Sequence, residues 1–425
     1  MFKFDYDSSN SCSSDPSQFM REIILISFLG PDQPNQFTRL MQVLSTHSLQ
    51  ILDVGQAVIH NQLTLGIVVS SDDQTATALA MKEILILAHD IGLTVRFKPI
   101  SATEYDQWVS EGGRTRYIVT ALAPELTAAH LQAVTNIVSN QGFNIETVTR
   151  LSGRPQLQNQ LEGPKRSCVQ FGLSGQMLDA TAMRAACLRL SSELSIDIAV
   201  QEDNAYRRNS RLVCFDMDST LIEQEVIDEL AIEAGVGEQV AEITERAMQG
   251  ELDFQQSFRA RVALLKGLDA SVLPKIAERL TITEGAERLI TTLKSLGYRT
   301  AILSGGFQYF AEYLQAKLGI DEVHANVLDV QDGYVTGEVK GHIVDGARKA
   351  FLLSELADNM GISPEQTIAV GDGANDLPML SLAGLGVAFR AKPLVRQNAN
   401  QAISSVGLDG VLYLLGVHDK DLNCA

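Results

Sequence analysis

The sequence of 425 residues has few features of a membrane or secreted protein. Its five cysteines are odd in number and form no Cys-x-x-Cys pair, which argues against a disulfide framework. No apolar run approaches the roughly 18 residues of a transmembrane helix. The N-terminus is acidic and serine-rich and lacks the apolar core of a signal peptide. We therefore expect a cytoplasmic protein without a membrane partner, in which residues 1–20 form a disordered tail.

Positive charge is also scarce. Lys and Arg number 34 and Asp and Glu 52, so the formal net charge is -18 and the pI about 4.8. Such a field repels nucleic acids, and none is expected as a partner. A small anionic substrate can still bind where cations are concentrated locally. The length and the 45% apolar content suggest about two to four domains with cores of ordinary size.

Two similar patterns fill the first 200 residues. Residues 21–105 read as strand, helix, strand, strand, helix, strand, and residues 114–200 repeat that order. The segments SLQILDV and GFNIETV occupy equivalent places 94 residues apart. This order is that of a ferredoxin-like fold, so a duplicated module is predicted. Residues 201–211 are polar and predict a linker.

Strands alternate with helices over residues 212–415, which predicts an α/β domain with a Rossmann-like parallel sheet. The segments LVCF, TAIL and TIAV are short and fully apolar, as buried parallel strands are. The helical block at about residues 223–284 separates the first two of these segments. Because it is too long for a plain crossover, we expect it to form a small helical cap inserted into the sheet domain.

Polar clusters follow these strands at the end where open α/β sheets bind ligands. Asp216 and Asp218 follow LVCF, Ser304 follows TAIL in the triplet SGG, and Asp372 follows TIAV in GDGANDLPM. Lys349 lies in the predicted helix that precedes TIAV. One sheet edge would bring these groups together. Two carboxylates as close as those of Asp216 and Asp218 then need a compensating cation.

The motifs DMDST, SGG, a lysine and GDGANDLPM, in that order, resemble those of the haloacid-dehalogenase-type phosphohydrolases. The resemblance implies an aspartyl-phosphate intermediate, with Asp216 as nucleophile and Asp218 as general acid and base. It also implies a Mg²⁺ ion held by Asp216, Asp372 and the backbone carbonyl of Asp218. Four other matching residues are expected to bind the phosphate: Ser304, Gly305, Lys349 and Asn375. Asp376 is expected to orient Lys349 or a metal-bound water.

The predicted cap segments DSTLIEQEVIDELA and MQGELDFQQSFRARVALLKGL resemble the phosphoserine phosphatase branch of these enzymes. The resemblance implies that Glu225 binds the substrate ammonium and Arg261 its carboxylate, with Met248 and Phe254 lining the pocket. Helix geometry favours Arg261, which falls about 60° from Phe258, at the edge of the apolar stripe of its helix. Arg259 falls about 100° away on the other side, towards solvent.

The residues alone leave plainer interpretations open. Asp216 and Asp218 could be helix N-caps, and Ser304 could belong to an ordinary turn. Arg261 could be a surface arginine that packs only its stem, and Glu225 a solvated acid favoured by a helix dipole. Arg348, adjacent to Lys349, could be the functional cation instead.

The two front modules are similar to ACT domains, which bind amino acids and associate through their sheets. One difference is Asn35 in GPDQPNQ, where a glycine is typical. The resemblance implies a homodimer, with serine or another amino acid as a ligand of the modules, although structural packing alone is as compatible. The expected activity is hydrolysis of phosphoserine to serine, the last step of serine synthesis. Two alternatives remain: transfer to another alcohol such as homoserine, and an amino-acid-sensing regulator with a vestigial phosphatase domain.

Overall fold

The computed structural model describes residues 21–112, 115–154 and 166–422, apart from the side chains of Glu111 and Met248. The chain divides into two compact units between residues 113 and 114. Within the described ranges, no helix is both long and apolar enough to cross a membrane. Residues 1–20, predicted to form a tail, lie outside the described residues.

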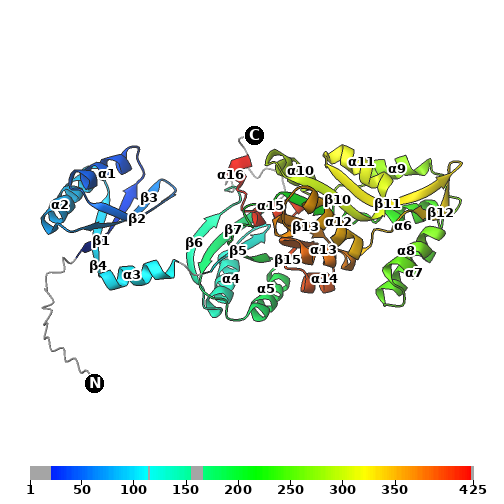
Figure 1. The fold of residues 1–425 in the computed structure, drawn as a ribbon, viewed down its shortest axis with the longest axis horizontal. Helices are drawn as coiled ribbons and strands as arrows, with labels where there is room; N and C mark the ends of the chain where they lie inside the picture. Colours follow the sequence, from blue (N-terminus) through cyan, green and yellow to red (C-terminus); the bar gives the residue numbers. More distant parts are fainter. Residues whose placement is uncertain (1–20, 113–114, 155–165, 423–425) are drawn as a thin grey trace, which may run out of the picture. The chain divides into compact units, whose positions relative to one another are not determined.

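The first unit has the predicted ferredoxin-like order (Figure 1). Its elements are β1 (Glu22–Pro31), α1 (Gln36–Thr46), β2 (Gln50–Ile59), β3 (Gln62–Ser71), α2 (Gln74–Asp90) and β4 (Thr94–Ile100). The antiparallel sheet has the order β2-β3-β1-β4, and Ile26 and Phe28 of β1 pack with Leu40 of α1 in its core. His60 and Asn61 connect β2 to β3 with positive φ angles of 48° and 59°, as a two-residue type I′ hairpin requires.

A helix that was not predicted follows this module. It is α3 (Ala102–Glu111), and it begins with a capping box. The Ser101 hydroxyl accepts from the Glu104 N–H at 3.2 Å, while the Glu104 carboxylate accepts from the Ser101 N–H at 2.9 Å. The segment SATE therefore carried the start signal of this helix, Ser-x-x-Glu.

The second unit begins with a module of the same topology. Its elements are β5 (Arg116–Ala123), α4 (Ala128–Asn140), β6 (Asn144–Arg150), β7 (Ser167–Ser174), α5 (Ala180–Leu194) and β8 (Asp197–Glu202). The sheet order β6-β7-β5-β8 matches that of the first module strand for strand. Val134 and Met183 attach the two helices to one face of the sheet. The duplication predicted from the sequence is therefore present in the fold.

The other face of this second module joins the core of the α/β domain. Leu122, Cys168 and Ala199 belong to one buried cluster with Leu408 and Leu412 near the C-terminus. Since these side chains share a core, the second module and the α/β domain are packed against each other rather than joined only by a linker.

Residues 201–211, expected to form a linker, are fixed at both ends. The first two complete β8, and the backbone N–H of Arg211 donates to the carbonyl of Gln366 at 2.9 Å. Beside this segment, the side chain of Gln401 bonds both backbone groups of Val200, accepting at 3.0 Å and donating at 2.6 Å. The amide thereby continues the hydrogen bonding of β8 towards the neighbouring sheet.

The α/β domain contains a sheet of seven strands. They are β9 (Leu212–Phe215), β10 (Arg299–Phe307), β11 (Glu322–Gln331), β12 (Tyr334–Lys340), β13 (Thr367–Gly371), β14 (Leu385–Phe389) and β15 (Gln401–Ile403). The order is β12-β11-β10-β9-β13-β14-β15, and β12 alone runs antiparallel to its neighbour. Strand β9 is central and buried along its whole length. Its uninterrupted apolar sequence reflects the helices on both faces of the sheet.

Helices and short 3₁₀ turns surround the sheet. They are α10 (Ala286–Ser295), α11 (Gln308–Leu318), α12 (Gly346–Asn359), η1 (Pro364–Gln366), η2 (Ala374–Asp376), α13 (Leu377–Leu382), α14 (Pro393–Asn398), η3 (Leu408–Gly410), α15 (Val411–Leu414) and α16 (Asp419–Leu422). In Figure 1 the second module lies beside the β15 edge, and this agrees with the contact between β8 and β15.

The predicted cap is a group of four helices between β9 and β10. They are α6 (Val226–Glu233), α7 (Gly237–Met248), α8 (Phe254–Ala263) and α9 (Val272–Arg279). The two connections to the sheet domain pair with each other through a bridge between Ile222 and Ile282. The chain after α8 is also tied to β12, because the N–H of Gly267 donates to the carbonyl of Val335 at 2.8 Å. The cap is therefore joined to the sheet domain at its base and also along β12.

Candidate active site

Three parallel strands end at one edge of the sheet and bring the predicted motifs together. Strand β9 pairs with β10 on one side and β13 on the other, with Phe215 in register with Ile302 and Val370. The residues that follow these positions include Asp216, Ser304 and Asp372. The fold thus places the candidate residues where ligands bind in parallel α/β sheets.

Lys349 is the cation of this edge. Asp345 caps α12 by accepting from the Arg348 N–H at 2.9 Å, and the second turn of that helix begins with Lys349. The fully buried ammonium lies 2.8 Å from Asp216 Oδ1 and 2.7 Å from Asp376 Oδ1. Arg348 instead lies over the ring of Phe351, at 4.6 Å. Between the two adjacent basic residues, the geometry selects Lys349.

Charge balance around Lys349 keeps its ammonium ionised. Burial acts to lower the pKa of Lys349, but the carboxylates of Asp216 and Asp376 outweigh it and raise the pKa. Burial and Asp376 raise the pKa of Asp216 well above its ordinary range, and Lys349 opposes that rise. One ammonium therefore does not fully offset the acidic groups around it.

Three carboxylates of this edge are arranged to hold a metal ion. Oxygen atoms of Asp216, Asp372 and Asp376 lie within 4.8 Å of one another. Burial, followed by Asp376 and Glu225, raises the pKa of Asp372 to about 7. Hard oxygen donors in a site with surplus negative charge fit Mg²⁺. Asp376 is already engaged, since its second oxygen accepts from the Gly373 N–H at 2.9 Å.

Asp218 lies between the sheet edge and the cap. Its Oδ1 accepts from the N–H of Val226, at the start of α6, at 3.2 Å. Burial and the nearby carboxylate of Glu225 raise the pKa of Asp218 well above its usual value. A Cβ atom on Gly306 would lie 2.5 Å from the other oxygen of Asp218. Glycine is therefore needed at that position to leave room for the carboxylate.

The phosphate-binding candidates surround Gly305. A Cβ atom at that position would lie 3.0 Å from the ring of Phe254 and 3.7 Å from the Asn375 amide nitrogen. Ser304 is buried, and its hydroxyl accepts from the Gly306 N–H at 2.9 Å. The cap residue Phe254 and the loop residue Asn375 thus face the same glycine.

The cap presents Arg261 towards the aspartates. Burial lowers the pKa of Arg261, while Glu225, Asp228 and Asp218 oppose that effect. Its Nε atom is buried and has no hydrogen-bond partner within the described part of the chain. Arg259 is exposed, as the helical geometry predicted.

The other two cap candidates are Glu225 and Met248. Glu225 is exposed, and its carboxylate accepts from the Ser219 hydroxyl at 3.0 Å. Met248 is the last residue of α7, and its side chain lies outside what the structure describes.

Comparison with known proteins identifies the family. A model of the haloacid dehalogenase-like hydrolases matches residues 213–381, and an ACT domain model matches residues 22–98. A phosphoserine phosphatase of Streptomyces coelicolor is 40% identical over 408 residues, covering 95% of this chain and 94% of the relative. The chain belongs to the phosphoserine phosphatase family of haloacid dehalogenase-like hydrolases.

Other members of the phosphoserine phosphatase family match to a similar extent. The phosphoserine phosphatase SerB2 of Mycobacterium tuberculosis is 39% identical over 95% of both chains. A crystal structure of a probable phosphoserine phosphatase from Vibrio cholerae aligns with a TM-score of 0.57 at 35% identity. It covers 74% of this chain and 90% of that one. The fold class predicted from the sequence, two ACT-like modules before a capped hydrolase domain, is confirmed.

Two features of this phosphoserine phosphatase family member were not predicted. Asn326 of β11 donates to the Gly305 carbonyl at 2.8 Å and accepts from the Val344 N–H at 2.9 Å, so it fixes the loop under the predicted phosphate site. Gln255 of α8 donates to the Asp345 carboxylate at 2.7 Å and connects the cap to the helix of Lys349. The start of β11 also carries Glu322 and His324, so the sequence offered no local signal that singles out Asn326.

Proposed function

We propose that the protein is a Mg²⁺-dependent phosphatase that hydrolyses O-phospho-L-serine to L-serine and phosphate through an aspartyl-phosphate. The observation that carries the proposal is the buried ammonium of Lys349, held between Asp216 and Asp376 beside the acidic cluster. This arrangement supplies a fixed carboxylate nucleophile and positive charge for phosphoryl oxygens, which are the main requirements of phosphoryl transfer.

Asp216 is suited to in-line attack because one of its oxygens is fixed. Asp216 Oδ1 accepts from Lys349 Nζ at 2.8 Å and from the Met217 N–H at 2.7 Å. We therefore assign the attack on phosphorus to Oδ2. The P–O bond to the serine oxygen breaks as the bond to Asp216 forms, and water later cleaves the resulting acyl phosphate.

Asp218 is suited to transfer the protons of both steps. Burial and Glu225 raise the pKa of Asp218, which favours the protonated form that donates its proton to the departing serine oxygen. The resulting carboxylate then removes a proton from the attacking water. The Val226 N–H holds one oxygen of Asp218, which keeps the carboxyl group oriented towards the sheet edge.

Asp216, Asp372 and the backbone carbonyl of Asp218 would hold Mg²⁺. When bound, the ion supplies positive charge that stabilises the phosphoryl oxygens. Asp376 is better placed to position Lys349 than to bind the ion, because its two oxygens accept from Lys349 and Gly373.

Substrate choice is assigned to the cap. The half-buried guanidinium of Arg261 is proposed to bind the serine carboxylate, and Glu225 the ammonium. Phe254 lies against Gly305 and would exclude water from the phosphate when the cap is closed. The hydrogen bond from Gln255 to Asp345 would hold that closed position. Ser304, Gly305 and Asn375 are proposed to bind phosphate oxygens.

The acceptor of the phosphoryl group tests the proposal. Hydrolysis and transfer to an alcohol such as homoserine pass through the same aspartyl-phosphate, so the products must be measured. We expect incubation with phosphoserine and Mg²⁺ to give serine and inorganic phosphate in equal amounts, with or without homoserine. Accumulation of phosphohomoserine at the expense of phosphate would instead identify a phosphotransferase. An inert protein would support a regulatory role with a vestigial phosphatase domain.

The ACT-like modules are proposed to make the protein a homodimer and to bind serine or another amino acid. Supporting the first, the edge strand β2 is exposed along nearly its whole length and carries the apolar side chains of Ile51, Val54 and Val58 on its surface. Light scattering of the full chain tests dimerisation, because a monomer at micromolar concentration would contradict it. In this proposal the enzyme acts in the cytoplasm at the last step of serine synthesis.

A further inference from the structure

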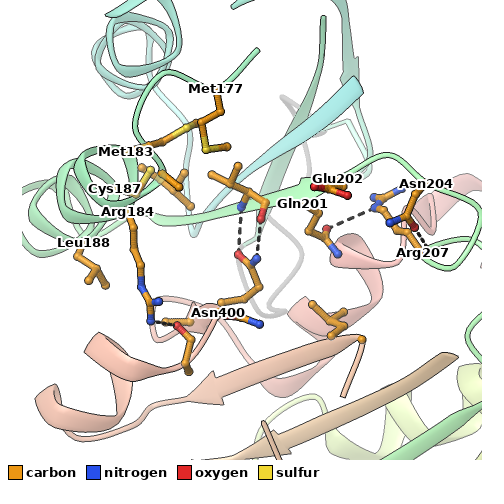
Figure 2. Close-up of a pocket in the computed structure, with 18 of the residues that line it drawn as sticks. Met177, Met183, Arg184, Cys187, Leu188, Gln201, Glu202, Asn204, Arg207 and Asn400 are labelled. Atoms are coloured by element: carbon orange, nitrogen blue, oxygen red, sulfur yellow. Dashed lines mark hydrogen bonds between the residues drawn. The ribbon is translucent and has the colours of Figure 1, made fainter. Parts of the chain in front are cut away.

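A cavity of about 410 Å³ lies between the second module and the α/β domain, apart from the candidate active site (Figure 2). One wall comes from α5 and β8, and the other from the region of α14 and β15. Its volume is in the range of small-molecule sites, which is about 300–1,000 Å³. None of its lining residues is among the candidates for catalysis, substrate or metal binding.

The cavity has an apolar end and a polar end. Figure 2 shows Met183, Cys187 and Leu188 together on one side, and Gln201 and Arg207 on the other. A ligand that fills both ends must therefore be amphipathic. It would place an apolar body against α5 and a polar group against the segment after β8.

Two guanidinium groups of the cavity, those of Arg207 and Arg396, form no ion pair within the described ranges, although Asp203 lies near the first and Asp197 near the second. Burial lowers the pKa of Arg207, and Asp203 opposes this effect. Asp203 is itself paired with Arg208 at 2.7 Å. The Nε atom of Arg396 is buried and has no hydrogen-bond partner among the described residues. Within the described ranges, no carboxylate lies within ion-pair distance of either Arg207 or Arg396.

The third arginine of the cavity has a structural role. Arg184 of α5 donates to the backbone carbonyls of Gln397, at 2.6 Å, and of Ala399. These carbonyls lie at the C-terminal end of α14, where a cation is favourable. Arg184 thus connects the two walls. Arg207 donates to the Gln201 side chain at 3.4 Å and to the Leu414 carbonyl at 3.1 Å, so an anion would use its remaining N–H groups together with the buried Nε of Arg396.

We propose that this cavity binds a small organic carboxylate with an aliphatic body. The carboxylate would pair with the guanidinium groups of Arg207 or Arg396, and the body would contact Met183 and Leu188. Although the chain has a net charge of -18, these two guanidinium groups lie at one cavity without an ion pair within the described ranges. Because each wall belongs to a different module, the ligand would also strengthen the docking of the second module on the α/β domain.

The test is calorimetric titration of the full chain with three matched compounds: hexanoate, hexanamide and norleucine. Hexanoate is expected to bind saturably with a Kd on the order of 1 mM or tighter, and hexanamide, which lacks the charge, at least tenfold more weakly. Norleucine carries the same carboxylate and adds an ammonium that Glu202, which also lines the cavity, could accept. Its affinity relative to hexanoate separates a simple acid from an amino acid as the ligand.

Matched variants locate the site. Arg207→Gln or Arg396→Gln should weaken hexanoate binding by roughly 10- to 100-fold, as expected for loss of a charged hydrogen-bond partner. Arg189→Gln, an exposed position on α5 outside the cavity, is the control and should leave the Kd unchanged. Arg261→Ala should also leave it unchanged, which excludes binding at the active site. Equal binding of hexanamide, or changes below tenfold in both cavity variants, would overturn the proposal.

A measurement on the unmutated chain avoids dependence on the folding of variants. Cys187 lines the cavity, and burial raises the pKa of its thiol to about 11, so alkylation at neutral pH should be slow. Hexanoate, but not hexanamide, should slow the alkylation of Cys187 further. Mass spectrometry of the Cys187 peptide gives the rate, with the buried Cys214 as internal reference. An unchanged rate at saturating hexanoate would contradict the assignment.

Discussion

The Arg261→Ala substitution should affect two substrates very differently. Arg261 is half-buried on cap helix α8, and its Nε atom has no hydrogen-bond partner within the described part of the chain. A substrate carboxylate would therefore form a charge-assisted, partly desolvated pair with it. Loss of one partner from such a pair costs about 2–5 kcal/mol. This corresponds to a fall of roughly 30- to 5,000-fold in kcat/KM for phosphoserine.

The assay compares phosphoserine with p-nitrophenyl phosphate, which has no carboxylate. For the second substrate, Arg261→Ala should change kcat/KM by only a small factor. Arg259→Ala is the matched control, because this exposed arginine lies on the same helix and should affect neither substrate. Equal losses for both substrates in Arg261→Ala would refute the reasoning. The arginine would then support the cap or the phosphate rather than the carboxylate.

Three further outcomes are expected. Asp218→Asn should slow both formation and hydrolysis of the aspartyl-phosphate by about 10²–10⁴ in rapid-quench experiments, and an unchanged rate would remove its acid–base role. Burial and Asp376 raise the pKa of Asp372 to about 7, so the folded state binds protons more tightly than the unfolded state. Thermal denaturation of the metal-free protein should accordingly show that the free energy of unfolding falls from pH 5 to pH 8. Mg²⁺ should stabilise the protein more at pH 8 than at pH 6, because the carboxylates that bind the ion must be deprotonated. The opposite trends would contradict this charge assignment. Gln255→Ala removes the hydrogen bond to Asp345, which is worth about 1 kcal/mol, and should raise KM for phosphoserine roughly fivefold with little change in stability. An unchanged KM would show that this bond does not hold the cap closed.

The catalytic edge was predictable because local sequence and topology agree there. A short, fully apolar segment such as LVCF is typical of a strand buried on both faces, and the carboxyl ends of parallel strands lie at the same edge of the sheet. The sequence therefore predicts that Asp216 and Asp372 lie together. The family resemblance favoured Lys349 over Arg348, but the residues alone left the choice open. Adjacent side chains on a helix point about 100° apart, and only the structure shows that Lys349 is the one directed at Asp216 and Asp376.

Long-range pairings were not predictable. Asn326 fixes the Gly305 loop, and Gln255 reaches Asp345 across 90 positions, but neither belongs to a motif with a local period. The joint core of the second module and the α/β domain was also missed. Strand β5 is almost continuously apolar, which indicates burial on both faces but does not say that the α/β domain covers the face of Leu122. The cavity between these two modules depends on the same docking.

The measurement that tests the central claim most directly is phosphate release from phosphoserine by the unmutated chain and by Asp216→Asn, each with Mg²⁺ and with excess chelator. Our account predicts turnover only for the unmutated chain with Mg²⁺. Asp216→Asn should give no turnover in either condition while keeping a cooperative thermal transition. Phosphate release by Asp216→Asn at the unmutated rate would contradict the covalent mechanism. Absence of release from the unmutated chain with Mg²⁺ would contradict the proposed activity itself.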